Sequence, residues 1–424
     1  MTKRPLQVTL GLLMLALAAT ALGIWWSERD ESLPSAPTAE AFITTPQQIE
    51  RGAYLARAGN CAACHTTRGG AAYAGGLGIA TPFGTVFSSN LTPDTANGLG
   101  LWSAADFWRA LHHGRSRDGH LLYPAFPYTS YTLVSRDDSD ALFAYLRSLA
   151  SVSRPNQPHT LDFPYRSQAA LALWRALFFK PVAFESESAK SPEWNRGAYL
   201  VRGLGHCAEC HAQRNALGAA KAPLELRGGP MPLQHWYAPS LAASHEAGVG
   251  PGDAEATIAL LKAGVAEGRS AMGPMAEVVY RSTQYLRDAD LRAMVVYLKD
   301  LPPSQTEARP GTTANPTAQF SDGEEIYSLH CADCHGKQGE GAQGAYAPLA
   351  DNRAVRLTTP SNLVQAVLNG GFAPATTANP RPYGMPPFRQ ILDDRQIAAV
   401  LTYIRQAWGN AAPPVSEFDV TQNQ

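Results

Sequence analysis

Three copies of one short motif constrain the fold of this 424-residue chain more than any other feature. All six cysteines fall within the motifs CAACH, CAECH and CADCH, each a C-x-x-C pair followed at once by a histidine. This spacing is the attachment signature of c-type haem, because two thiols on one helical turn add to the porphyrin vinyl groups and the adjacent imidazole binds the iron. The sequence therefore predicts three covalently bound haem c groups. The attaching residues would be Cys61, Cys64, Cys207, Cys210, Cys331 and Cys334, and the proximal iron ligands His65, His211 and His335.

Three other interpretations of a C-x-x-C pair have less support. One such pair is typical of a redox disulfide, two pairs together are typical of a zinc site, and exported chains also form structural disulfides. Three independent C-x-x-C-H motifs with no cysteine left over favour haem attachment over all of these.

The chain is a threefold repeat built around the motifs. ERGAYLARAGNCAACH (50–65) closely matches NRGAYLVRGLGHCAECH (195–211), and DGEEIYSLHCADCH (322–335) is a looser third copy. Each copy predicts a helix that ends at the motif, and each repeat closes on a second helical pattern, at 138–149, 288–301 and 393–408. We therefore expect three tandem helical haem domains. Their expected ranges are 45–185, 190–303 and 316–412, with a tail at 413–424.

Residues 1–30 have the pattern of an exported chain. Lys3 and Arg4 precede an uncharged run, residues 5–26, that would span about 33 Å as a helix, enough for a bilayer core of roughly 30 Å. A cleavable signal peptide is the alternative, with ALA (16–18) or ATA (19–21) as its cleavage site. Because the run continues to the interfacial pair Trp25 and Trp26, we expect an uncleaved anchor, and hence a location at the inner (cytoplasmic) membrane on the periplasmic face.

Several longer stretches give the chain a family resemblance. With RGAYLARAGNCAACHT, TPFGTVFSSNLTPD, LDFPYRSQAALALWRALFF, GPMAEVV and YGMPPF, it resembles the membrane-bound triheme cytochrome c subunits of bacterial periplasmic dehydrogenases, over nearly the whole chain after residue 30. These subunits serve alcohol, gluconate, sorbitol, fructose, aldehyde or N-heterocycle dehydrogenases. The resemblance implies an all-α fold of three tandem class I cytochrome c domains behind an N-terminal transmembrane helix.

A class I cytochrome c domain usually places a methionine ligand on a loop before its last helix, and this ligand raises the reduction potential. In the third domain the candidate is Met385 of GMPPF, eighteen residues before Tyr403. In the second domain the resemblance implies Met275 of GPMAEVV. Met272 is the local alternative, and Met294, inside a helical pattern, is expected in the core.

Backbone carbonyls are expected behind the proximal histidines. In such domains a proline carbonyl often accepts a hydrogen bond from the histidine Nδ1, which fixes the tautomer and strengthens the imidazole as a ligand. Pro239 and Pro348 are the candidates in the second and third domains.

The first domain departs from this pattern. Phe126 lies nineteen residues before Tyr145 and so occupies the methionine position, and no methionine occurs between Met14 and Met231. The first haem then has a histidine ligand, or is five-coordinate under Phe126, or is completed by a neighbouring domain or partner. A second histidine would lower its potential relative to the other two haems. The candidate histidines are His120, His112, His113 and His159.

These features predict an electron-transfer subunit rather than an enzyme. The resemblance implies electron delivery from a periplasmic dehydrogenase subunit to ubiquinone or a terminal oxidase, and YPAFPY (123–128) leans towards a molybdenum-dependent aldehyde or N-heterocycle dehydrogenase. The alternatives are a quinoprotein or flavoprotein alcohol or sugar dehydrogenase as partner, a haem enzyme acting at an open first haem, and a free-standing electron shuttle. A net charge of −1 without a basic run gives no reason to expect nucleic acid.

Overall fold

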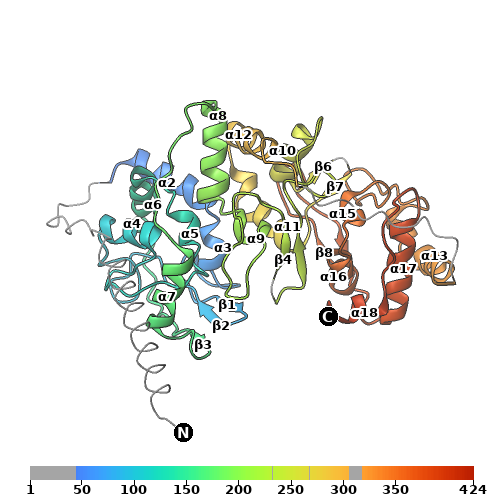
Figure 1. Cartoon of the computed structure of the whole chain (residues 1–424), viewed down its shortest axis with the longest axis horizontal. Helices are drawn as coiled ribbons and strands as arrows, with labels where there is room; N and C mark the ends of the chain where they lie inside the picture. The colour runs from blue at the N-terminus through green and yellow to red at the C-terminus, as the bar shows by residue number, and fades with distance from the viewer. Residues whose placement is uncertain (1–43, 232, 267, 305–317) are drawn as a thin grey trace, which may run out of the picture.

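The computed structural model describes residues 44–424 except 232, 267 and 305–317. Three domains follow one another along the long axis of the molecule, from the first at the blue end to the third at the red end (Figure 1). In each domain a first helix leads into the C-x-x-C-H motif, and a closing helix packs across that first helix.

The first domain contains six helices and one three-stranded sheet among its described residues. The helices are α2 (Pro46–Ala58), α3 (Cys61–His65), α4 (Ala104–His113), α5 (Tyr128–Tyr131), α6 (Arg136–Arg147) and α7 (Gln168–Phe178). The strands are β1 (Gly78–Thr81), β2 (Gly84–Phe87) and β3 (Thr160–Leu161), paired antiparallel in that order with Gly78 opposite Phe87.

The second and third domains repeat the plan with smaller sheets. The second has α8 (Pro192–Tyr199), the π-helix η1 (Leu200–Leu204), α9 (Ala208–His211), β4 (Gly229–Met231), β5 (Trp236–Ala238), α10 (Ala254–Ala263), β6 (Val265–Ala266), β7 (Arg269–Ser270), α11 (Gly273–Arg281), the 3-10 helix η2 (Thr283–Tyr285) and α12 (Asp288–Lys299). The third has α13 (Ala318–His330), α14 (Ala332–His335), α15 (Arg353–Arg356), α16 (Ser361–Asn369), β8 (Gly371–Phe372), β9 (Gly384–Met385), α17 (Asp394–Gln406) and α18 (Glu417–Thr421).

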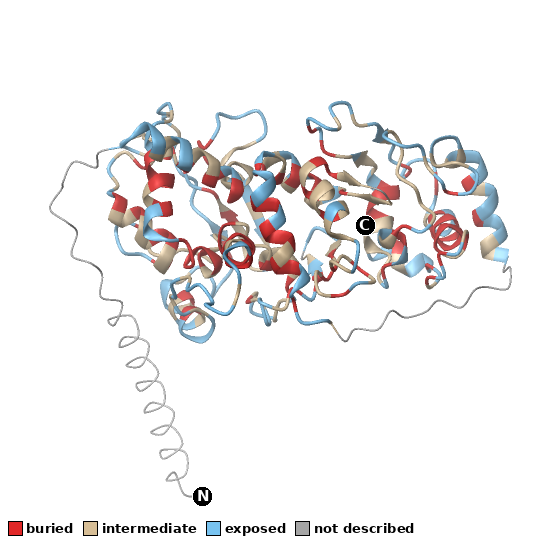
Figure 2. Ribbon diagram, turned by 90° about the horizontal axis from the view of Figure 1, so that it is seen from above, coloured by how far each residue is buried: buried red, intermediate tan, exposed pale blue. Residues whose placement is uncertain are grey.

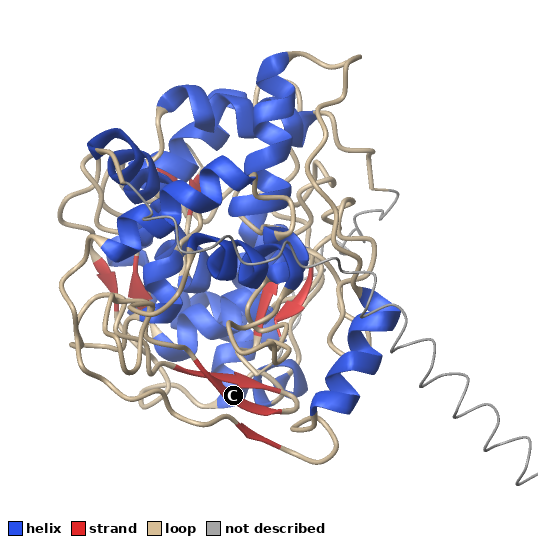
Figure 3. Cartoon of the chain, turned by 90° about the vertical axis from the view of Figure 1, so that its left-hand side faces the viewer, coloured by secondary structure: helices blue, strands red, loops and turns tan. Residues whose placement is uncertain are grey.

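The prediction of an all-α fold is wrong, because the described residues include four small antiparallel sheets among the helices. Figure 3 shows these strands as short segments within the loops. The long Gly- and Pro-rich loops must pair their backbone groups, and antiparallel pairing does so locally. In the first domain, for example, two residues connect β1 to β2, and Gly84 adopts a φ of +111° that a side chain would disfavour.

The predictions of a transmembrane helix and of an inner-membrane location are corrected as well. Within residues 44–424 as described, no helix combines the length and the apolar character needed to cross a bilayer. The expected anchor or signal, residues 1–30, lies outside the described residues.

A glycine allows the close helix crossing in every domain. α2 crosses α6, α8 crosses α12, and α13 crosses α17. A Cβ on Gly52 would lie 1.9 Å from the Ala141 carbonyl oxygen, and one on Gly323 would lie 2.2 Å from that of Ala399. Gly197 faces Ala293 in the same way, at 1.8 Å. These distances leave no room for a side chain, so the glycine of each repeat sets the separation of the two helices.

Each domain has a core, but the first two cores exchange residues. Tyr199 and Leu204 of the second domain are buried in the first core, and Ala58 at the end of α2 is buried in the second. The third core draws its buried residues from Tyr327 to Val420 and includes the C-terminal α18. Figure 2 shows the buried faces of the paired helices in red. The first two domains thus form a pair, while the third has a core of its own.

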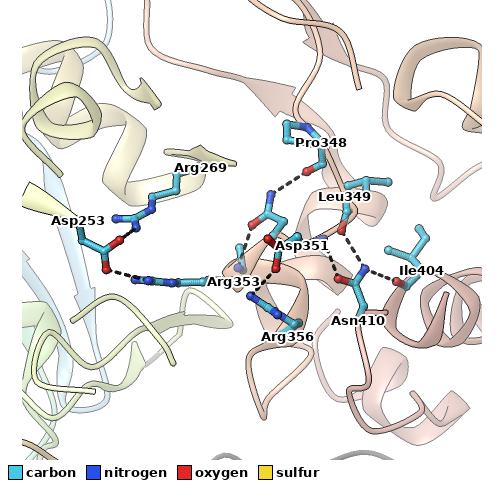
Figure 4. A network of polar contacts seen from close by, with 11 residues as sticks. Asp253, Arg269, Pro348, Leu349, Asp351, Arg353, Arg356, Ile404 and Asn410 are labelled. Carbon is cyan, nitrogen blue, oxygen red and sulfur yellow. Dashed lines mark hydrogen bonds and ion pairs between the residues drawn. The ribbon is translucent and has the colours of Figure 1, made fainter. Parts of the chain in front are cut away.

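The third domain joins the second through polar contacts. Arg353 of α15 donates to Asp253 Oδ2 at 2.7 Å, and Asp253 also pairs with Arg269 of its own domain (Figure 4). Asn362 of α16 exchanges two hydrogen bonds of 2.8 Å with the backbone of Tyr237. Although burial acts in the opposite direction, the bonds from the two arginines hold the pKa of Asp253 below its ordinary value.

Candidate haem-binding sites

Each C-x-x-C-H motif forms a short helical segment directly after the first helix of its domain. In the first domain Asn60 turns the chain between α2 and α3 with a φ of +50°, and in the second His206 does so with a φ of +37°. These left-handed residues end the first helix and let the motif begin in a new direction.

The second domain has one more residue between the tyrosine of RGAY and its motif than the first domain has. Cys61 lies seven positions after Tyr54, and Cys207 lies eight positions after Tyr199. The π-helix η1 absorbs the extra residue, with the Gly205 amide donating to the carbonyl five residues earlier at 2.7 Å. Both motifs therefore occupy corresponding places in their domains.

The three histidines predicted as proximal ligands are oriented by equivalent hydrogen bonds. Their Nδ1 atoms donate to backbone carbonyls, which leaves Nε2 to bind an iron. Burial lowers the pKa of each imidazole, although the carbonyl contact acts in the opposite direction, and thus favours the neutral form that ligates a metal. The pairs are His65 with Ser89 at 2.7 Å, His211 with Pro239 at 2.7 Å and His335 with Ala347 at 2.9 Å.

The structure confirms Pro239 as a carbonyl acceptor and corrects Pro348. The carbonyl of Pro348 instead accepts from Asn352 Nδ2 at 2.8 Å, and the preceding residue serves His335. The accepting residue lies two positions before a half-buried leucine in every domain. These leucines are Leu91, Leu241 and Leu349, each packed against the core of its own domain. Because the acceptor is a backbone carbonyl, any residue type can supply it. The position two residues before the leucine therefore identifies the acceptor in all three domains, and a proline is not required.

The thiols do not resemble those of a redox disulfide or a zinc site. All six are free, and burial raises the pKa of Cys61 and of Cys207 to about 12 and that of Cys331 to about 11. A reactive redox cysteine has the opposite shift. No group of three or more metal-ligating side chains converges in the described part of the chain. The raised pKa values thus set these thiols apart from reactive redox cysteines.

The predicted sixth-ligand positions lie against the same cores as the cysteines. Met275 of α11 packs against the core that Cys207 borders, and Met385 of β9 packs against the core that Cys331 borders. Met272 precedes α11, and its terminal methyl group lies near Gly371 of the third domain instead. Two thiols, a tethered imidazole and a thioether around each of these two cores fit a haem c.

Phe126 holds the corresponding position in the first domain. It packs against the core that Cys61 borders, and its ring centroid lies 5.5 Å from that of Tyr131 and 6.5 Å from that of Tyr128. The ligand assignments themselves stay predictions, including the sixth ligand of the first haem.

The four candidate histidines of the first domain have other contacts. His112 stacks on Trp108 with centroids 4.4 Å apart, and His113 meets the same ring edge-on. His120 Nδ1 donates to Asp118 at 2.5 Å. His159 Nδ1 accepts from the backbone amide of Phe87 at 3.1 Å.

A glycine-rich stretch in the third domain is a false signal for nucleotide binding. GEGAQG (339–344) matches G-x-G-x-x-G, but it lies in the loop between α14 and α15. A dinucleotide site needs this pattern between a strand and a helix N-terminus. The stretch instead forms turns beside the His335 motif, with the Gly341 amide donating to the His335 carbonyl at 2.8 Å.

Comparison with known proteins identifies the family. The sequence profile described as cytochrome c matches residues 49–150 and 320–408. The cytochrome c subunit of the quinone alcohol dehydrogenase of Gluconacetobacter polyoxogenes is 38% identical over 408 residues, which cover 92% of this chain and 86% of that protein. This chain belongs to the family of dehydrogenase cytochrome c subunits. The gluconate 2-dehydrogenase cytochrome c subunit of Pantoea cypripedii, another member, is 36% identical over 380 residues, 86% of each chain.

A further match extends the range of dehydrogenases. One of the subunits of nicotinate dehydrogenase from Pseudomonas putida is 38% identical over 404 residues, which cover 94% of this chain and 33% of that protein. As a member of the dehydrogenase cytochrome c subunit family, the chain carries covalently bound c-type haem and serves electron transfer beside a catalytic dehydrogenase subunit. It is not itself the catalytic subunit.

Proposed function

We propose that the chain carries three haem c groups, one on each motif, and passes electrons from a periplasmic dehydrogenase subunit to ubiquinone or a terminal oxidase. The support for three is that each domain repeats a C-x-x-C-H segment and a histidine Nδ1 bonded to a backbone carbonyl. A haem held in this way changes between ferrous and ferric iron and so carries one electron.

The protein groups have separate roles in this transfer. In each domain the two thiols would hold the porphyrin and the tethered imidazole would bind the iron. Met275 and Met385 supply the second ligand in the later domains, which raises the potential of those two sites. With Phe126 in the same position, the first site lacks this contribution and has the lowest potential of the three.

The contacts between domains support an order in which the second site lies between the other two. The first and second motifs meet where His206 Nε2 donates to the Gly59 carbonyl at 3.3 Å. The second and third domains meet where α11, which carries Met275, contacts β8, the partner strand of Met385. Electrons entering at the first site would therefore pass through the second to reach the third.

For the partner we propose a molybdenum-dependent aldehyde or N-heterocycle dehydrogenase. Nicotinate is an N-heterocycle, and a protein named as part of nicotinate dehydrogenase matches almost the whole chain. The alcohol and gluconate relatives support the alternative of a quinoprotein or flavoprotein partner. Purification of the native complex followed by metal and cofactor analysis of the partner separates these two classes.

Haem counting tests the central proposal. The purified holoprotein should contain three haems per chain by the pyridine haemochrome assay and by intact mass. One thioether bond should be lost in each of the variants Cys64→Ala, Cys210→Ala and Cys334→Ala. In the purified complex, adding the substrate of the dehydrogenase should reduce the haems. A count of two or fewer, or haems that stay oxidised in the presence of substrate, would overturn it.

Phe126 favours one second candidate function, a ligand-binding or peroxidatic reaction at an open first haem. Its phenyl ring has no atom that binds iron. Carbon monoxide binding to the reduced protein, at one site per chain, would support this candidate. If carbon monoxide does not bind, this second candidate fails.

A further inference from the structure

Two tyrosines from the repeated RGAY sequence make equivalent hydrogen bonds across the interface between the first two domains. Tyr54 of α2 donates to Asp290 Oδ2 at 2.5 Å and accepts from the Arg287 amide at 3.1 Å. Tyr199 of α8 donates to Asp138 Oδ2 at 2.7 Å and accepts from the Ser135 amide at 3.2 Å. Each hydroxyl thus connects the first helix of one domain to the start of the closing helix of the other. We call Tyr54 and Tyr199, with their aspartates, the reciprocal tyrosine pair.

An arginine from the same sequence repeat balances each aspartate. Arg51 donates to Asp138 through Nε at 2.6 Å, and Arg196 donates to Asp290 through two nitrogens at 2.7 and 3.0 Å. Each aspartate therefore binds the arginine of its own domain and the tyrosine of the other. Burial, together with the bond to Asp290, raises the pKa of Tyr54 to about 12, so its hydroxyl stays protonated and able to donate.

The tyrosine-bearing helices lead directly into the two haem motifs. Beyond the tyrosines, Ala58 enters the second core and Leu204 enters the first. The motifs then meet, because His206 of the second domain donates to the Gly59 carbonyl of the first domain at 3.3 Å. Tyr131 of the first domain donates to the same carbonyl at 3.0 Å. The orientation of one haem motif relative to the other thus depends on the two helices that the tyrosines hold.

The third domain shows that these bonds are not needed for the fold of a single haem domain. Counting from the crossing glycine, Glu325 takes the place of Tyr54, and Gln396 takes the place of Asp138 at the third residue of the closing helix. The third domain nevertheless has the same helix crossing and the same histidine–carbonyl bond. The reciprocal tyrosine pair therefore belongs to the interface and not to the fold of one domain.

We propose that Tyr54 and Tyr199 are positioning residues that orient the first haem site relative to the second and thereby maintain electron exchange between these two haems. The proposal rests on the proposed function, since it needs a haem on each of the two motifs. The residues act at a distance from the porphyrins, through the helices that carry the motifs. Cutting both bonds loosens one haem site against the other without removing a haem ligand.

The test compares Tyr54→Phe, Tyr199→Phe and the double variant with the wild-type holoprotein. Tyr237→Phe is the matched control, because that hydroxyl also donates to a carboxylate, Glu246 at 3.1 Å, but within one domain. Haem content is measured first. Spin–spin interaction between the ferric haems is then measured by electron paramagnetic resonance, and the rate of electron transfer between haems by transient absorption after photoreduction.

The double variant is expected to keep its full haem content and axial-ligand spectra, to lose the spin–spin interaction, and to transfer electrons at least tenfold more slowly. The single variants should show a spin–spin interaction and a transfer rate between those of the wild type and the double variant. Tyr237→Phe should match the wild type in both. An unchanged interaction and rate in the folded double variant would overturn the proposal. If the double variant does not fold, the single variants decide it by the same two measurements. A wild-type haem count below three contradicts the proposed function instead, which separates the two failures.

Discussion

The first and third domains share a motif and a helix crossing but differ in what completes them. In the first domain the core includes Tyr199 and Leu204 of its neighbour, and Phe126 stands in the predicted ligand position. In the third domain the buried core comes from the domain itself, and Met385 stands in that position. The crossing is thus common to both domains, while the source of the buried core and the residue in the predicted ligand position differ between them.

Separating the domains should give the largest effect. A fragment of residues 314–424 is expected to fold with one haem, because its core is its own. A fragment of residues 44–185 is expected to stay unfolded, because it lacks two residues of its core. Circular dichroism and haem content of both fragments, produced with the haem-attachment machinery, provide the measurement. A folded first-domain fragment would show that the exchanged residues are dispensable.

Closing the helix crossing should affect both domains alike. The new methyl group would lie 1.9 Å from a carbonyl oxygen in Gly52→Ala and 2.2 Å from one in Gly323→Ala, so the two helices must separate. We expect each variant to lose about 3 kcal/mol of unfolding free energy. Gly268→Ala is a control with open space around the new methyl group, although its positive φ adds some strain. Denaturant unfolding of the full chain measures the change, and a loss in only one domain would mean that the crossings are not equivalent.

Exchanging the ligand-position residues should exchange the properties of the two sites. Phe126→Met is expected to raise the potential of the first haem by roughly 0.1 V, a modest part of the roughly 0.8 V that axial ligands control. Met385→Phe should lower that of the third haem by a similar amount. Redox titration and the methionine–iron band in near-infrared magnetic circular dichroism measure both. If Phe126→Met gains no such band, a histidine or a partner already holds that position.

Acid should destabilise the interface between the first two domains slightly more than it destabilises the third domain. Burial alone would raise the pKa of Asp290, but the bonds from Arg196 and Tyr54 hold it below the ordinary value of 3.8. The stabilisation is therefore complete above about pH 4 and is lost as the pH falls through the depressed pKa. Gln396, at the equivalent place in the third domain, does not titrate. Between pH 5 and 2 the thermal unfolding temperature should decrease by a few degrees, and Asp290→Asn should abolish this decrease. If the variant is as sensitive to acid as the wild type, the prediction is wrong.

The sequence was sufficient for the local features of the sites. The closing helices expected at 138–149, 288–301 and 393–408 occur at Arg136–Arg147, Asp288–Lys299 and Asp394–Gln406. Their apolar periodicity and their polar first turns are encoded within a dozen residues. The repeated geometry of the C-x-x-C-H segment is likewise local, since the cysteines and the histidine lie on one short turn.

Features that depend on distant partners could not be predicted. β3 has only two residues and pairs with β2, more than 70 positions earlier, so no run of alternating residues announces it. The tyrosine of RGAY is visible as a repeat, but periodicity alone places it on a buried face without saying which domain it faces. For Pro348 the error was the choice of residue type: a backbone carbonyl accepts the bond, and any residue two positions before the leucine can supply it.

The π-helix in the second domain has a consequence for how length can vary between related chains. One extra residue in a regular α-helix would rotate everything after it by about 100° and shift it by about 1.5 Å. Tyr199 is held upstream by Asp138, and the motif beginning at Cys207 is held downstream by its own domain, so neither end can accept that rotation. The wider turn at Leu200–Leu204 takes up the rotation between them. Insertions and deletions in this segment are therefore expected to appear at the wide turn, and the phase of the helix on either side of it should not change.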